Sequence, residues 1–411
     1  MGAGPMPPDV VTTVLSLTTA DGARVPGVLY RVPGASTVAV LMHPRLDLSR
    51  HYLTSLLATA GVSVYVQGTR SVGNDLTLVH EQALLDAGAG MVELRRLGFE
   101  TIVTVGASGG GPLFAFYLQQ AGRAPDARLT HAPGGRPAGL AEADLPAPDG
   151  VAFVAAHPGQ GELLLGCIDP AVADEADPRR TIAALDLFDE SNGFVPPFGS
   201  SRYSEEFLAT YRAAQRARVE RIDARARALL AEKAEAAARW DAGGTPDDRR
   251  RSALDEVITV YRSDADPRTV DLSLDRSERP YGSVQGSRPD VGNGTAGGFG
   301  RLSTPEAWLS TWSGLSSNAR FVTCAPEIAV PTLFIEYTGD QANFPSVSAE
   351  MFAAIGAADK SFTRLRGTHF GGSILAGEPP GGRAAGAEIA GWIADRFTVP
   401  VSPQSLEGAA R

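Results

Sequence analysis

One serine of this chain has the neighbours expected of a catalytic nucleophile. Residues 106–111 read GASGGG, after a Val- and Thr-rich run at 101–105 and before a helical pattern at 112–121. Gly-x-Ser-x-Gly between a strand and a helix is typical of a nucleophile elbow, in which the serine has a strained backbone that flanking side chains would obstruct. A Gly-rich structural turn and a dinucleotide-binding turn are the alternatives, but Gly-x-Gly-x-x-Gly is not written here. We therefore predict that Ser108 is a nucleophile.

A serine hydroxyl is a weak nucleophile at neutral pH and needs a base within hydrogen-bond distance. His369, in RGTHFGG at residues 366–372, is the sole histidine after residue 157. It follows a short strand expected at 361–365. We predict that His369 is the general base, with a surface or packing histidine as the alternative.

The acid that orients this histidine is expected after the apolar run at 330–337. Asp340 ends the segment TGD at 338–340, where its carboxylate can accept a hydrogen bond from one ring nitrogen. A turn-capping aspartate is the alternative role for Asp340, and Glu336 is the rival acid.

An oxyanion formed during acyl transfer needs backbone N–H donors. Gly109, directly after the serine, is expected to supply one. The second is expected from the loop HPRL at 43–46, where Pro44 has no N–H, so we predict Arg45 with Leu46 as the fallback. The Arg45 side chain is interpreted as solvated, with contact to an anionic substrate as the alternative.

Further residues are predicted to contact the substrate. His43, Leu46 and His157 follow expected strands and would border the nucleophile, although a structural role is the alternative for His157. Aromatic side chains of the middle segment would supply an apolar pocket, and they are Phe194, Phe198, Tyr203 and Trp308.

The elements that must position these residues alternate between strands and helices. Strands are expected at 11–18, 25–31, 37–42, 62–66, 101–105, 151–155, 330–337 and 361–365, and helices at 49–60, 81–97, 112–121 and 384–397. Continuous apolar runs such as TVAVLM at 37–42 are typical of strands buried on both faces. The alternation predicts an α/β fold with a doubly wound, mostly parallel sheet.

The alternation stops between about residues 167 and 303. Residues 204–240 form one long helical pattern or two abutting helices, with an apolar stripe at Phe207, Tyr211, Val219, Ile222, Ala226 and Leu229. Residues 276–301, rich in Gly, Ser, Pro and Asn, predict an irregular loop. We expect a catalytic domain at 1–166 and 304–411, interrupted by a mainly helical domain at 167–303, and a loose tail at 402–411.

The composition restricts the classes of partner, cofactor and cellular location that we expect. The formal net charge of −10 disfavours nucleic acid, and no apolar run approaches the ~20 residues of a membrane helix. The first residues lack the basic and apolar parts of a secretory signal, so the expected location is cytoplasmic. Cys167 and Cys324 are expected to be free and buried, and no cluster has zinc or iron spacing, so no metal or cofactor is expected. A homodimer is left open.

Taken together, these motifs resemble the α/β-hydrolase superfamily. The resemblance covers roughly residues 10–166 and 304–400, and rests on His-Pro at 43–44, GASGGG at 106–111, GD at 339–340 and TH at 368–369. It implies that 167–303 is a cap or lid domain over Ser108. A serine at the elbow argues against the halide and epoxide branches, which use aspartate. The superfamily usually has His-Gly where His-Pro stands here, which bears on the second oxyanion donor.

The function expected from these residues is hydrolysis of a small or medium hydrophobic carboxylic ester through an acyl-enzyme on Ser108. An amidase, thioesterase or carbon–carbon bond hydrolase would use the same triad, and the fold does not separate these activities. A non-catalytic small-ligand-binding protein on the same fold is the alternative from a different class, although a binder has no need of the acid.

Overall fold

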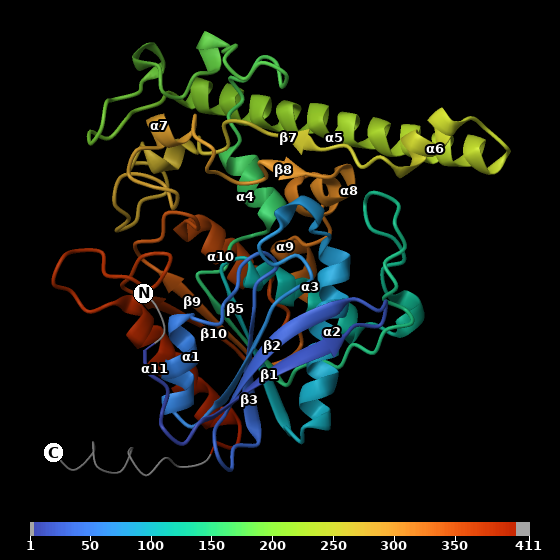
Figure 1. Cartoon of the computed structure of the whole chain (residues 1–411). Coiled ribbons are helices and arrows are strands. Elements are labelled where there is room, and N and C mark those ends of the chain that lie inside the picture. Colours follow the sequence, from blue (N-terminus) through green and yellow to red (C-terminus); the bar gives the residue numbers. More distant parts are fainter. Residues whose placement is uncertain (1–3, 400–411) are drawn as a thin grey trace.

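A computed structural model describes residues 4–399 of the chain, and the tail expected at 402–411 lies outside this range. Its centre is an eight-stranded sheet in the order β1-β2-β4-β3-β5-β6-β9-β10 (Figure 1). The strands are β1 (Val11–Thr18), β2 (Arg24–Arg31), β3 (Thr37–Met42), β4 (Ser63–Gln67), β5 (Thr101–Ala107), β6 (Gly150–Val154), β9 (Thr332–Tyr337) and β10 (Lys360–Leu365).

Strand β2 runs antiparallel to both β1 and β4, whereas β4, β3, β5, β6, β9 and β10 are parallel to one another. This arrangement confirms the predicted mostly parallel sheet. Because parallel strands end at the same edge, the loops after β3, β5, β6, β9 and β10 all begin there.

Both faces of the sheet are covered by helices. Along β3, Val38, Val40 and Met42 belong to one apolar cluster, and the alternate residues Ala39 and Leu41 belong to the other. Because side chains alternate across a strand, a strand covered on both faces must be apolar at every position. The confirmed doubly wound arrangement therefore explains the uninterrupted apolar run at 37–42.

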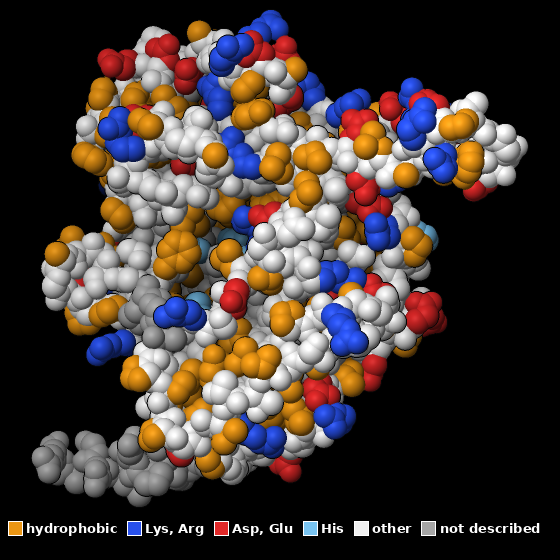
Figure 2. All heavy atoms as spheres, viewed as in Figure 1, with side chains coloured by type: hydrophobic (Ala, Val, Ile, Leu, Met, Phe, Trp, Pro, Cys, Tyr) orange, Lys and Arg blue, Asp and Glu red, His pale blue; other side chains and the backbone are white. Residues whose placement is uncertain are grey.

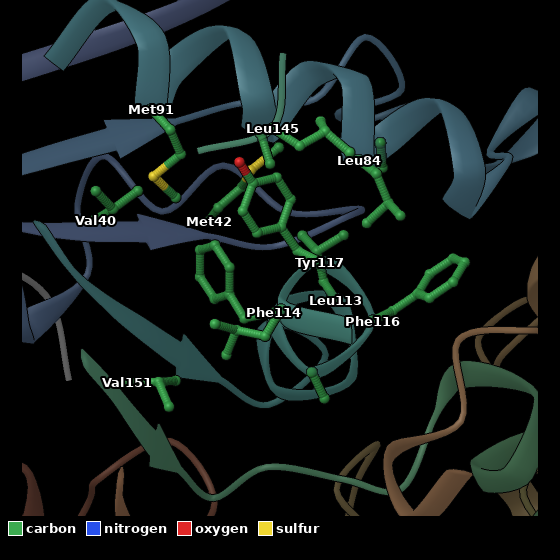
Figure 3. Close-up of a cluster of buried hydrophobic side chains, with 14 of the residues drawn as sticks. Val40, Met42, Leu84, Met91, Leu113, Phe114, Phe116, Tyr117, Leu145 and Val151 are labelled. Carbon is green, nitrogen blue, oxygen red and sulfur yellow. The ribbon is translucent and has the colours of Figure 1, made fainter. Parts of the chain in front are cut away.

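The two helical layers have different members. The first cluster includes residues of α2 (His80–Arg96), α3 (Gly110–Gly122) and α10 (Pro345–Ala354), and Figure 3 shows its side chains from β3, α2 and α3. The second includes residues of α1 (Tyr52–Thr59) and α11 (Gly381–Arg396). Helix α1 begins three residues later than expected, because His51 caps its N-terminus by accepting a hydrogen bond from the Leu53 N–H.

A mainly helical insertion separates β6 from β9, and Figure 1 shows it along one end of the sheet domain. Its elements, together with the short segments that lead back to β9, are α4 (Gln160–Cys167), α5 (Glu205–Asp241), α6 (Pro246–Ala253), β7 (Ile258–Thr259), α7 (Pro289–Gly292), β8 (Leu302–Ser303), α8 (Pro305–Ala307) and α9 (Phe321–Cys324). Short 3₁₀ turns lie at Asp75–Thr77, Pro125–Ala127, Ala183–Leu185, Glu190–Asn192, Pro267–Thr269 and Ala325–Glu327, and a π-helical turn at Trp308–Trp312. The division of the chain at residues 167 and 303 stays a prediction.

Helix α5 is one continuous helix of 37 residues, which settles the alternative of two abutting helices. Five residues of its predicted stripe are buried, namely Tyr211, Val219, Ile222, Ala226 and Leu229, and Phe207 is half-buried. The end of α5 carries α6 beyond the body of the molecule (Figure 1).

The segment 276–301 contains a single helix, α7, and is otherwise irregular, as expected. Buried hydrogen bonds hold it to other parts of the insertion, from Asn293 Nδ2 to Asp169 Oδ2 (2.7 Å) and from Ser283 Oγ to Asp264 Oδ2 (2.9 Å). Both cysteines are free and buried. Within residues 4–399, none of the helices has the length and apolar character required to cross a membrane.

Candidate active site

The turn between β5 and α3 holds Ser108 in an unusual backbone conformation. Its φ of 51° lies in the left-handed region, which non-glycine residues rarely occupy and which marks functional strain. A Cβ on Gly110 would lie 2.4 Å from the Met42 carbonyl oxygen, and one on Gly106 would lie 2.8 Å from the Gly110 carbonyl oxygen. Glycine is therefore required on both sides of this turn.

Ser108, His369 and Asp340 form a hydrogen-bonded chain. Ser108 Oγ lies 2.9 Å from His369 Nε2, and His369 Nδ1 lies 2.8 Å from Asp340 Oδ2 and 3.0 Å from Oδ1. The backbone N–H groups of Ala342 and Asn343 donate to Asp340 Oδ1 and fix the carboxylate. The three residues follow β5, β10 and β9, so the shared edge of the sheet brings them together.

Glu336, the rival acid, points elsewhere. Its carboxylate is buried, and Oε1 accepts a hydrogen bond of 2.9 Å from Arg364 Nε on the neighbouring strand β10. It therefore serves an ion pair within the sheet, while Asp340 contacts His369.

Backbone donors for an oxyanion are only partly where the sequence placed them. The Gly109 amide stands at the start of α3 and makes no hydrogen bond with the residues described. The Arg45 and Leu46 amides, the predicted second donor and its fallback, instead donate to His43 Nδ1, at 3.0 and 3.1 Å. Both amides are therefore occupied, because the His43 ring folds back over its own loop.

The Arg45 side chain is partly exposed and is paired with a carboxylate of the chain. Its guanidinium group is paired with Asp75 and lies 4.7 Å from the Trp312 ring centroid and 5.7 Å from that of Phe299. Since Phe299 belongs to the insertion, Arg45 links the loop after β3 to that part of the chain.

Buried imidazole rings surround the Gly109 backbone. His157 Nδ1 accepts a hydrogen bond from the Gly159 N–H, as His43 Nδ1 does from its own loop. The position of a Cβ on Gly109 would lie 2.3 Å from Gln160 Nε2, 2.7 Å from His43 Nε2 and 3.1 Å from His157 Nε2. Burial lowers the pKa of His43 well below its usual value and that of His157 to about 3. Both rings are therefore neutral near pH 7.

A small cavity lies beside the Ser108 hydroxyl. Its volume is about 90 Å³, and its lining includes Ser108 and His369 together with His43, Leu46, Leu48, His51, Tyr52, Ala107, Val154 and Phe370. Figure 2 shows histidine atoms inside the hollow between the insertion and the sheet domain. A much larger groove of about 1180 Å³ lies under α5 and α6 and contains no residue of the Ser108–His369–Asp340 chain.

Two residues that were predicted to contact the substrate, Phe194 and Trp308, are buried in the insertion or in the segment that follows it. Phe194 packs against Phe188 with ring centroids 5.5 Å apart, and the fully buried Trp308 donates its indole N–H to Asp223 Oδ1 at 2.7 Å. Neither residue lines the cavity beside Ser108. Among the other expected aromatics, Tyr203 stacks on Phe207, and the exposed Phe198 contacts Tyr281.

Sequence reasoning missed several residues of this cavity. Leu48, His51 and Tyr52 come directly after the loop that was expected to face the nucleophile, and Phe370 follows His369. Their proximity in sequence to predicted site residues was the signal that could have identified them.

The buried histidines make stability depend on pH. Burial also lowers the pKa of His51 and His80 to about 4. A base with a lowered pKa in the folded state contributes stability above its unfolded pKa of about 6.5 and loses it as pH falls. Each such histidine is expected to remove up to about 1.4 kcal/mol per pH unit from the free energy of unfolding below that pKa.

The expected result is a free energy of unfolding, measured by urea titration, that falls between pH 6.5 and pH 5. The variant His51→Asn keeps an oxygen that can accept from the Leu53 N–H and removes one titrating ring. The free energy of unfolding of this variant should fall less steeply with decreasing pH than that of the wild type. The difference should correspond to the titration of about one histidine. Identical slopes in the two proteins would contradict the proton linkage assigned to His51.

Comparison with known proteins gives structural matches alone. No protein-family model and no curated protein matches the chain. A DcsB complex with a substrate analogue has 13% identity and a TM-score of 0.51, covering 94% of this chain and 100% of that one. A hypothetical protein from Pseudomonas aeruginosa has 14% identity and a TM-score of 0.49, with 96% of each chain covered. The esterase domain of a Rhodothermus marinus protein has 11% identity and a TM-score of 0.42, covering 94% of this chain and 98% of that one. At these identities the likeness concerns the fold.

Proposed function

We propose that this chain, which has the α/β-hydrolase fold, is a serine hydrolase that cleaves carboxylic esters. The observation that carries the proposal is the continuous hydrogen-bonded chain from Ser108 Oγ through His369 to Asp340, with distances of 2.9 and 2.8 Å. A left-handed Ser108 at the end of β5 supports it, because strain of this kind clusters at functional sites.

In the proposed reaction, Ser108 Oγ attacks the ester carbonyl carbon while its proton passes to His369 Nε2. The carbonyl π electrons move to the oxygen, which the Gly109 amide stabilises together with the N-terminal end of α3. Asp340 holds the ring in the tautomer whose Nε2 is free to accept, and stabilises the imidazolium ion that forms.

The tetrahedral intermediate then collapses. The carbon–oxygen bond to the alcohol breaks, and His369 Nε2–H protonates the departing oxygen. Water attacks the resulting acyl-enzyme with His369 again as the base. Cleavage of the bond to Oγ returns the proton to Ser108 and releases the acid.

The cavity beside Ser108 favours a short acyl group. Its volume of about 90 Å³ is the space of about three water molecules. Its apolar lining residues include Leu46, Leu48, Val154 and Phe370. The insertion is proposed as a cap, and its Phe299 contacts Arg45 of the loop that borders this cavity.

We expect kcat/KM to fall about 10- to 100-fold from p-nitrophenyl butyrate to the octanoate, because the longer chain exceeds the cavity. Leu48→Ala should raise the octanoate value relative to butyrate, since Leu48 lines the cavity. Leu375→Ala is the matched control, because Leu375 is exposed and lies outside the lining. Equal rates for both esters in the wild type would contradict the size argument.

The proposal itself is tested by labelling with a fluorophosphonate probe and locating the adduct by peptide mass spectrometry. A single adduct on Ser108 that is prevented by His369→Ala is the expected result. A chain that binds esters without labelling or turnover would instead be a binding protein. Parallel assays with an anilide and a thioester separate the ester activity from the other acyl transfers that use the same triad.

A further inference from the structure

The backbone amides predicted as the second oxyanion donor are not free. Pro44 lacks an N–H, and the amides of Arg45 and Leu46 both donate to His43 Nδ1. The Gly109 amide therefore needs a partner other than these two amides, because a tetrahedral oxyanion is usually held by two or more donors.

The neutral His43 ring carries its proton on Nε2, so that this atom is a hydrogen-bond donor. Its Nδ1 accepts two backbone N–H bonds and so carries no proton, which leaves the proton of the neutral ring on Nε2. In the part of the chain that is described, His43 Nε2 has no hydrogen-bond partner. Some of its surface is accessible, because it is absent from the fully buried polar atoms that lack a partner. The Nε2–H of His43 is therefore unoccupied and not sealed in the interior.

This N–H lies beside the first donor. His43 lines the same cavity as Ser108 and His369, and its Nε2 is 2.7 Å from the position of a Cβ on Gly109. His157 Nε2 and Gln160 Nε2 also approach Gly109, but neither residue lines the cavity, and the amide atoms of Gln160 are sealed. Of these three residues, His43 is the one that lines the cavity beside Ser108.

We infer that His43 Nε2–H is the second oxyanion donor, a side-chain imidazole in place of the usual backbone amide. The inference rests on the proposed esterase function and adds a catalytic residue to it. A neutral imidazole suits this role, since it can polarise a carbonyl without bringing its own charge into the site. Burial lowers the pKa of His43, and the nearby Arg45 and the rings of His157, His369 and His80 act in the same direction.

Two substitutions at this position separate the functions of the two ring nitrogens. His43→Asn keeps an acceptor near Nδ1 for the Arg45 and Leu46 amides and removes the Nε2–H donor. His43→Gln places an amide N–H near Nε2 and gives up the Nδ1 acceptor. We expect His43→Asn to lower kcat about 100- to 1000-fold, with KM changed less than about 3-fold. His43→Gln should stay within about 10-fold of the wild type.

A trifluoromethyl ketone, which forms a tetrahedral adduct with the serine, gives a second measurement. Its inhibition constant should rise in His43→Asn by the same factor as kcat/KM falls, because both report stabilisation of the oxyanion. Thermal unfolding checks that the variants are folded.

The outcomes are distinguishable. If Ser108→Ala is inactive while His43→Asn keeps kcat within about 3-fold, the inference is overturned and the proposed function stands. A larger loss in His43→Gln than in His43→Asn would also overturn it, because the loop contact of Nδ1 would then be what matters. If Ser108→Ala keeps the wild-type rate, the proposed function fails and the inference fails with it.

Discussion

Replacement of Ser108 by alanine is expected to lower kcat/KM for p-nitrophenyl butyrate by at least about 10⁴-fold. The substitution removes the oxygen that forms the acyl-enzyme, and leaves His369 and Asp340 in contact 2.8 Å apart. Residual turnover should come from the Gly109 amide and from binding alone. Initial rates over a substrate series, on protein checked by thermal unfolding, measure the effect.

The same experiment tests whether the three residues act as a unit. Ser108→Ala combined with His369→Ala should be no slower than Ser108→Ala within about 3-fold, because members of one triad are not additive. Glu336→Gln is the matched acid control, since Glu336 is buried but bonded to Arg364. It should keep most of the wild-type rate. Turnover by Ser108→Ala above about 1% of the wild type would rule out Ser108 as the nucleophile.

The sheet could be predicted from sequence because its requirements are local. Strand β3 is apolar at every position, since both of its faces are covered, and the predicted range 37–42 is the observed one. The predicted ends of helices were less accurate where a hydrogen bond from a side chain determines the first helical residue. Helix α1 begins at Tyr52 because His51 bonds to the Leu53 amide, a contact that periodicity does not encode.

The contact between Ser108, His369 and Asp340 was predictable for a different reason. Each residue follows a strand of one parallel sheet, and parallel strands end at one edge, so the order along the chain carried spatial information. The choice of Asp340 over Glu336 depended on position, since a loop residue can turn towards the site while a strand residue contacts its neighbouring strand.

The second oxyanion donor and the cavity lining could not be predicted in this way. The Arg45 amide was the expected donor, but only the folded loop reveals that it bonds to His43 Nδ1. Phe194 and Trp308 were expected in the pocket because they are aromatic. Burial in the insertion core uses the same property, and Trp308 is fully buried against Asp223. Composition alone does not separate the two uses.

Replacement of Asp340 by asparagine is expected to lower kcat/KM about 10³- to 10⁴-fold with little change in folding. The backbone amides of Ala342 and Asn343 donate to Asp340 Oδ1, and the side-chain carbonyl oxygen of the Asp340→Asn variant can still accept both hydrogen bonds. The new NH₂ group would face His369 Nδ1 as a donor. Nδ1 must then be the acceptor, which puts the ring proton on Nε2. A protonated Nε2 of the neutral ring cannot accept the proton of Ser108, so the general base is lost.

Comparison with Asp340→Ala separates orientation of His369 from support of the turn. The alanine variant loses both the contact with His369 and the two backbone hydrogen bonds, so its thermal midpoint should fall further than that of Asp340→Asn. Similar rate losses in the two variants with different midpoints would assign the loss to the missing carboxylate beside His369 and not to the turn. An Asp340→Asn protein with nearly full activity would show that His369 is oriented by another group, and the proposed acid would have to be abandoned.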